Sequence, residues 1–161
     1  MIKISRWKRK LGIGLAVGIL GFMMSISSVT VQASSILDEV TETTADYAED
    51  TSYSLLRGSH LNSGTVKIQK VSSNEIAIYG LTQCHHTCDT LYLYLYLERK
   101  VNGSYGTYKY WKFTANKATS LSRTIEVIVP SGTYYRVRGY HAAQHGSKES
   151  TSTLTSGILI K

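Results

Sequence analysis

Residues 132–141, Gly-Thr-Tyr-Tyr-Arg-Val-Arg-Gly-Tyr-His, decide how the rest of the sequence is interpreted. Aromatic and β-branched residues of this kind favour an extended strand, and a turn signal, Pro130-Ser131-Gly132, precedes them. A polar loop with Gly146 then reverses the chain, and a Ser/Thr-rich run leads to an apolar end at 158–160. We predict a hairpin of two long strands, over about 133–142 and 150–160, against which the earlier segments pack.

The clearest single strand covers residues 91–97, which alternate strictly between leucine and tyrosine. In an extended chain successive side chains point to opposite faces, so the leucines share one face and the tyrosines the other. We expect the leucines to form part of the core. The tyrosines would then lie on the wetter face of the same sheet.

Four more strands are predicted between turn residues; they cover 65–71, 75–81, 106–113 and 121–129. Together with 91–97 and the closing hairpin, they make seven short strands at near-regular spacing. This pattern is typical of an antiparallel β-sandwich. The sandwich is expected over 57–161, a normal length for one domain with one core.

Residues 1–33 have the pattern of a secretory signal peptide. A basic start ending at Lys10 precedes an apolar run over 11–24, and small residues follow up to Ala33. The apolar run is shorter than the ~20 residues of a membrane-spanning helix. We therefore predict a secreted, extracellular protein that meets the membrane only through this peptide before cleavage, with an uncleaved anchor as the alternative.

The charge of the chain is unevenly distributed. Residues 1–33 hold five of the 18 Lys and Arg and none of the 11 Asp and Glu, so the net charge of +7 falls to +2 without them. This removes the main argument for nucleic-acid binding. Residues 34–52 carry six acidic side chains and no Lys or Arg, and the segment 34–56 is predicted to be an acidic linker or a removable pro-segment.

The two cysteines occur together in residues 84–88, Cys-His-His-Thr-Cys. In an exported chain the default interpretation is a disulfide between Cys84 and Cys88. Imidazole and carboxylate groups are ordinary ligands of Zn²⁺ or Cu²⁺, and the neighbouring loops of an immunoglobulin-like topology lie at one end. A metal site is the alternative interpretation for a set of loop histidines near Asp89, namely His85, His86, His141 and His145. The plainer interpretation is that these histidines are solvated and that the protein binds no cofactor.

A second candidate site is an aromatic and basic face. Tyrosine rings beside arginine suit glycans, peptides or a protein partner, whereas cross-strand packing for sheet stability is the simpler explanation. The candidate ligand-binding residues are Tyr92, Tyr94, Tyr96, Tyr110, Arg136 and Arg138.

Catalysis is not expected from this sequence. It has no GxSxG, HExxH or glycine-rich phosphate-binding motif, and no spacing singles out a pair of carboxylates for glycoside hydrolysis. We therefore predict that the protein is not an enzyme.

The final part of the chain resembles a known fold family. Residues 134–141, followed by Gly146-Ser147 and Glu149-Ser150, are similar to the last two strands of fibronectin type III domains, whose strand has the form YxxRVxAxN. His141 stands where that family often has Asn. The resemblance implies an immunoglobulin-like sandwich and a tyrosine-corner role for Tyr134 or Tyr135.

Residues 57–161 also resemble short secreted proteins of Gram-positive bacteria that are uncharacterised. The sequence thus predicts a non-catalytic binding module at the cell envelope, with an extracellular protein or glycan as its partner. A metal-binding protein that uses the histidine loops, and a small antagonist with an acidic pro-segment, are the alternatives.

Overall fold

The computed structural model describes residues 41–54 and 60–161. The predicted signal peptide, with residues 34–40 and 55–59, lies outside this part of the chain. Within the described residues the structure is all-β and has no helix, so it contains no helix that is long and apolar enough to cross a membrane. The prediction of an all-β fold is confirmed.

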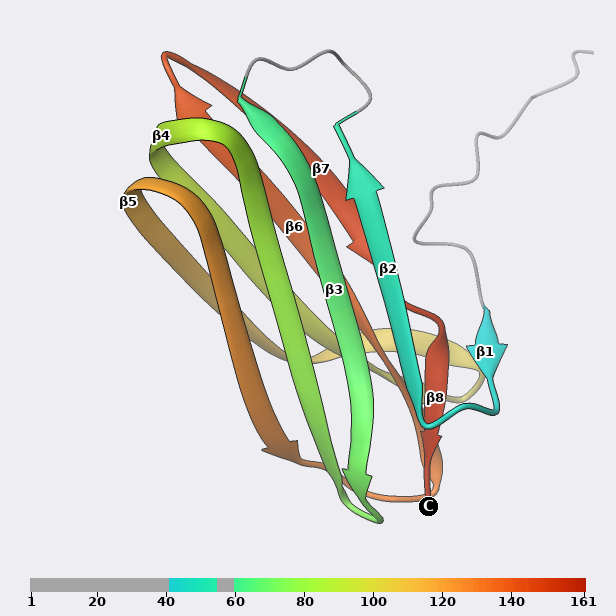
Figure 1. Cartoon of the computed structure of the whole chain (residues 1–161). Coiled ribbons are helices and arrows are strands. Elements are labelled where there is room, and N and C mark those ends of the chain that lie inside the picture. Colours follow the sequence, from blue (N-terminus) through green and yellow to red (C-terminus); the bar gives the residue numbers. More distant parts are fainter. Residues whose placement is uncertain (1–40, 55–59) are drawn as a thin grey trace, which may run out of the picture. The chain divides into compact units, whose positions relative to one another are not determined.

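Eight strands follow one another along the chain (Figure 1). They are β1 (Glu42–Thr43), β2 (Tyr47–Tyr53), β3 (Leu61–Ser72), β4 (Glu75–Val101), β5 (Ser104–Ile128), β6 (Thr133–His145), β7 (Ser147–Leu154) and β8 (Gly157–Ile160). They form one mixed sheet in the order β1-β8-β6-β4-β3-β2, with β5 paired to β4 and β7 paired to β6. Only the β1–β8 pair in this sheet is parallel; the other pairs are antiparallel.

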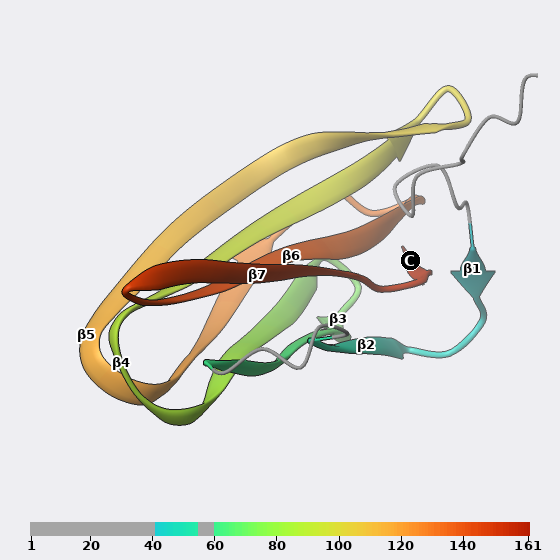
Figure 2. The ribbon, with the colours of Figure 1, turned by 90° about the horizontal axis from the view of Figure 1, so that it is seen from above.

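The sheet folds over into two layers, one containing β3 and the other containing β6, and the long strands β4 and β5 run through both. The first half of β4 pairs with β3 and its second half pairs with β6, while β5 follows β4 through both halves. The register between β4 and β5 shifts between Gln83 and Cys88, where both strands turn over (Figures 1 and 2). The sheet therefore curls until it is nearly barrel-shaped.

This architecture corrects the predicted strand count. The segments 75–81 and 91–97 belong to one strand, because the chain between them stays extended through the bulge at 84–88. The segments 106–113 and 121–129 are joined in the same way in β5, and the last predicted strand is divided into β7 and β8. The seven-stranded immunoglobulin or fibronectin III-like sandwich is not confirmed.

The acidic segment 34–56 also needs correction, because part of it belongs to the sheet. Strand β2 pairs with β3 from Tyr47↔Gln69 to Tyr53↔Ser63. Ala48 is buried in the core, and the alternation of β2 directs acidic side chains such as Glu49 outward. The acidic composition suggested a solvated linker, yet charged residues on the outer face of an edge strand have the same composition.

The core lies where the alternation of residues 91–97 predicts. Leu91, Leu93, Leu95 and Leu97 are fully buried, whereas the three tyrosines between them are half-buried. Isoleucine and valine from neighbouring strands complete this core; they include Val66, Ile68, Ile76, Ile78, Val127, Val137, Ile158 and Ile160. Tyr135 is buried as well, and its hydroxyl donates a hydrogen bond to the Pro130 carbonyl at 2.8 Å, as a tyrosine corner does.

Side chains bridge the gap between β2 and β7, which are not neighbours in the sheet order. Asp50 Oδ2 accepts a hydrogen bond from the Leu154 amide at 2.8 Å, and Ser52 Oγ lies 2.7 Å from Thr151 Oγ1. Nearby, Glu149 Oε2 accepts the amide of Leu61 at 2.8 Å. We call this line the β2–β7 seam.

His141 occupies the space between the two layers, not a loop at one end. Its Nδ1 lies 3.0 Å from Thr82 Oγ1 and its Nε2 lies 2.9 Å from Thr153 Oγ1. The fully buried ring is accommodated by two glycines: an added Cβ would come within 2.2 Å of the ring at Gly64 and 2.5 Å at Gly139. The predicted place of His141 among the loop histidines was wrong, because the strand continues past it to His145.

We expect Gly64→Ala to destabilise the protein, because its new methyl group overlaps the His141 ring. Overpacking of this kind typically costs about 1–3 kcal/mol. Gly106→Ala is the matched control, since nothing lies within 4 Å of an added Cβ there. Urea titration of both variants measures the difference; equal midpoints would show that the histidine does not fill this space.

Stability is expected to fall as the pH is lowered from about 6.5 to 4. Burial lowers the pKa of His141 from 6.5 to about 4, so the unfolded chain binds a proton in this window that the folded chain does not. Stability is therefore complete above the unfolded pKa, and about 3 kcal/mol is lost as the pH approaches the folded value. NMR of the His141 ring tests this: a titration midpoint near 6.5 in the folded protein would contradict it.

Candidate functional site

A row of tyrosines lies on the outer face of β4 and β6. Tyr92, Tyr94 and Tyr96 alternate with the buried leucines and are therefore directed away from the core. The register places Tyr140 of β6 opposite Tyr94, and their ring centroids are 5.4 Å apart. On the other side of β4, Tyr110 of β5 stacks with Tyr96 at 6.3 Å. Four of the predicted residues are thus brought together on one surface.

Cationic side chains lie against these rings. The Arg138 guanidinium carbon lies 4.1 Å from the centre of the Tyr96 ring, and Lys148 Nζ lies 4.2 Å from that of Tyr92. Lys112 Nζ is 5.2 Å from the ring of Tyr94. Cations at these distances are attracted to the negative face of the ring by about 0.5–1 kcal/mol where the site is exposed. We call the four tyrosines of β4 and β6, with Arg138, Lys148 and Lys112, the tyrosine–cation face.

The tyrosine–cation face contains a depression of about 290 Å³. Its lining comes from β4, β6 and β7 and consists of Tyr94, Tyr96, Arg138, Tyr140, Lys148 and Ser152. These side chains offer aromatic surface, two positive charges, three phenolic hydroxyls and the hydroxyl of Ser152. Such a lining suits a ligand that has both flat apolar surfaces and negative charge.

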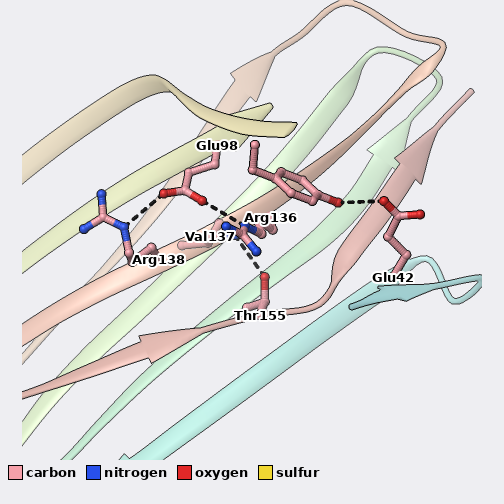
Figure 3. A network of polar contacts seen from close by, with 7 residues as sticks. Glu42, Glu98, Arg136, Val137, Arg138 and Thr155 are labelled. Carbon is pink, nitrogen blue, oxygen red and sulfur yellow. Dashed lines mark hydrogen bonds and ion pairs between the residues drawn. The ribbon is translucent and has the colours of Figure 1, made fainter. Parts of the chain in front are cut away.

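Arg138 is held in place by a buried carboxylate. Glu98 Oε1 accepts a hydrogen bond from Arg138 Nε at 3.0 Å, and Oε2 accepts one from Arg136 Nε at 2.8 Å (Figure 3). Glu98 and Arg136 are almost completely buried, whereas about a quarter of the Arg138 side chain is exposed. Because its Nε is bound, the Arg138 guanidinium cannot rotate freely, and only its outer part faces solvent.

Arg136 is almost completely buried, so the structure does not bring it to the surface with the other candidate ligand-binding residues. Its guanidinium lies 4.2 Å from the centre of the Tyr105 ring, and the Tyr105 hydroxyl donates to Glu42 at 3.3 Å. Burial, and then the Glu42 carboxylate, raises the pKa of Tyr105 above its ordinary value. Between the two arginines, the Val137 amide donates to Thr155 Oγ1 at 2.9 Å (Figure 3).

The predicted site residues omit three members of the tyrosine–cation face, namely Tyr140, Lys148 and Lys112. Tyr140 lies two residues after Arg138, so period-2 alternation places both on one face and was sufficient to find it. Lys148 depends on the pairing of β7 with β6, in which Gln144 faces Lys148. That register is not evident from the residues themselves.

Three histidines form a cluster at the end of the sheet where β4 turns over. The ring centroids of His60, His86 and His145 are 5.2, 5.4 and 5.2 Å apart. His60, to which the sequence assigned no role, completes the set, whereas His85 is exposed on the neighbouring position. As they stand, no three His, Cys, Asp or Glu side chains in the described part of the chain are arranged to hold a metal ion.

The two cysteines lie beneath this end of the sheet. Both are buried and carry free thiols in this structure, so the predicted disulfide is not formed here. Burial, together with the neighbouring Cys88, raises the pKa of the Cys84 thiol to about 12. In this state the thiol is protonated at neutral pH and is a poor nucleophile and a poor metal ligand.

One protein family matches this chain. Its model, described as a family of unknown function (DUF6147), covers residues 33–157, which is most of the sequence. A comparison with curated proteins finds no match. The matched range includes β1 and β2 as well as the tyrosine–cation face.

Removing the charge of Glu98 should strongly destabilise the protein, because the buried guanidinium of Arg136 would lose its ion pair with this carboxylate. Breaking a buried ion pair from one side costs about 3–5 kcal/mol. The expected result for Glu98→Gln is a large drop in the denaturation midpoint, with Glu126→Gln on the exposed surface of β5 as the control. A similar midpoint for both variants would show that Glu98 does not anchor the arginines.

Proposed function

We propose that this chain, which belongs to the DUF6147 family of unknown function, is an exported binding module of the cell envelope and not an enzyme. Its ligand is an anionic glycan or a similar anionic polymer, bound on the tyrosine–cation face. The second candidate ligand for this face is an acidic surface on an extracellular protein. The observation that carries the proposal is the position of Arg138 and Lys148 above tyrosine rings around one depression.

The chemistry of the depression supports binding to sugar rings that bear acidic groups. Tyrosine rings present flat surfaces that pack against the C–H faces of sugars, and their hydroxyls form hydrogen bonds at the rim. Arginine and lysine form charge-assisted hydrogen bonds with carboxylate, sulfate or phosphate groups. Because Glu98 fixes Arg138, less side-chain entropy is lost when a ligand binds.

The same lining supports a non-catalytic role. In the described residues, the depression is lined by phenols, two cations and the Ser152 hydroxyl, with no carboxylate, thiol or imidazole. General acid–base catalysis uses histidine most often, and the described lining of the depression has none, although lysine and tyrosine also serve in some enzymes. An ordered aromatic and cationic surface without carboxylate, thiol or imidazole groups is typical of recognition.

Export remains part of the proposal and is supported by the sequence. Residues 1–33 have the basic, apolar and small-residue segments of a signal peptide. Outside the cell, the neighbouring thiols of Cys84 and Cys88 would meet conditions in which disulfides form. We also propose that the fold is related to immunoglobulin-like domains. The hydrogen bond from the Tyr135 hydroxyl to the Pro130 carbonyl supports this relationship.

The alternative of a removable pro-segment over 34–56 is less well supported. Its removal would take away β2, which pairs with β3 along its whole length, and the Asp50 carboxylate that binds the Leu154 amide. The metal-binding alternative concerns the histidine cluster and is independent of the tyrosine–cation face.

The proposal predicts selective binding of acidic oligosaccharides. Isothermal titration with a uronic-acid oligosaccharide and with its neutral counterpart should show binding of the acidic form alone, weakened by added salt. We expect Arg138→Ala and Lys148→Ala each to weaken binding about tenfold, because each removes a charge-assisted hydrogen bond.

Lys67→Ala is the matched control, since Lys67 also lies over a tyrosine ring, that of Tyr47, but on β3. Equal binding of the acidic and neutral sugars would exclude charge recognition. Unchanged binding in both tyrosine–cation face variants would place the ligand elsewhere.

A further inference from the structure

The histidine cluster brings together three imidazoles from separate segments of the chain. His60 immediately precedes β3, His86 lies in the bulge of β4, and His145 is the last residue of β6. All three pairs of ring centroids are 5.2–5.4 Å apart. Imidazoles bound to one tetrahedral ion have centroids roughly 5 Å apart, given metal–nitrogen bonds of about 2.0–2.1 Å. The spacing of the three rings is therefore that of a shared ion.

Two of the rings have oxygen partners on the nitrogen that a metal would not use. His145 Nδ1 lies 3.3 Å from Asp89 Oδ2, and His86 Nδ1 lies 3.0 Å from the Thr87 carbonyl. In metal sites, a carboxylate or a backbone carbonyl commonly accepts the second N–H of each ligating histidine and fixes its tautomer. These contacts place the proton on Nδ1, so Nε2 of both rings is the nitrogen that would bind a metal.

We propose that His60, His86 and His145 bind a divalent transition-metal ion of the Zn²⁺ or Cu²⁺ class, with Asp89 as the residue that orients His145. A fourth coordination position is left for water or for an anionic ligand. Imidazole nitrogen is a good ligand for both ions.

The site needs a small rearrangement before it can bind. His60 Nδ1 and His86 Nε2 are 3.1 Å apart and share a hydrogen bond, so a proton lies between two nitrogens that would both contact the metal. Metal binding requires that proton to move from Nδ1 to Nε2 of the His60 ring, because the ligating nitrogens must be unprotonated. Rotation of the rings about their side-chain bonds then directs all three nitrogens to one point, an arrangement they do not have in the described structure.

The nearby thiols are not part of this site in the reduced protein. Cys84 and Cys88 are buried, and the raised pKa of the Cys84 thiol opposes the thiolate form that metals bind. The experiment can therefore separate imidazole ligation from thiolate ligation.

The test is titration of the purified protein with Zn²⁺ by calorimetry and with Co²⁺ by visible absorption. We expect one ion per chain and a Co²⁺ spectrum without the strong charge-transfer band of thiolate ligands. His60→Ala, His86→Ala and His145→Ala should each abolish binding at micromolar metal. Asp89→Asn should weaken binding about tenfold, the usual effect of losing an outer-shell partner.

His85→Ala is the matched control and should bind as the unaltered protein does, because His85 is adjacent to His86 but exposed. The double variant Cys84→Ser/Cys88→Ser should also retain binding. The proposal is wrong if micromolar Zn²⁺ does not bind, if the His60 variant binds normally, or if the cysteine variant loses the ion. Binding of acidic sugars to these histidine variants reports separately on the tyrosine–cation face.

Discussion

The two-fold alternation of side chains along β4 is the constraint on which the structure depends. Each leucine directed into the core obliges its neighbour to point outward, so the residues that stabilise the fold also determine where the tyrosines lie. A shift of one residue in register would exchange the two sets. Because β4 pairs with β3, β5 and β6, its register is transmitted to most of the sheet. The core and the candidate binding surface are therefore two sides of one strand.

Polar groups inside this structure are consistently paired. His141 is held by two threonine hydroxyls, and Glu98 by two arginines. In the described residues, no buried side-chain nitrogen or oxygen lacks a hydrogen-bond partner. Buried groups that lose a partner are costly, so these contacts restrict which packing arrangements are possible. In the case of Glu98, the restriction extends to the surface, because the same carboxylate also positions Arg138.

Local alternation was sufficient to predict the all-β class, the leucine core and most of the tyrosine–cation face. Alternation did not predict the strand bounds correctly where the chain stays extended through polar residues. The bulge at 84–88 has the composition of a loop, yet it lies within β4. His141 has the appearance of a polar loop residue, and Gly64 of β3 and Gly139 of β6 make room for its ring inside. The gathering of His60 with His86 and His145 depends on how three distant segments meet, which no local pattern contains.

The β2–β7 seam is a line along which the curled sheet can open locally, without cooperative unfolding of the other strands. Elsewhere the strands are joined by ladders of backbone hydrogen bonds, whereas here individual side chains such as Asp50 and Ser52 make the connection. Side-chain bonds break one at a time and expose few backbone groups when they do. Amide hydrogens beside this line should consequently exchange with solvent sooner than those in the centre of β4, and brief parting of the two edges would admit water to the interior without unfolding the remaining strands.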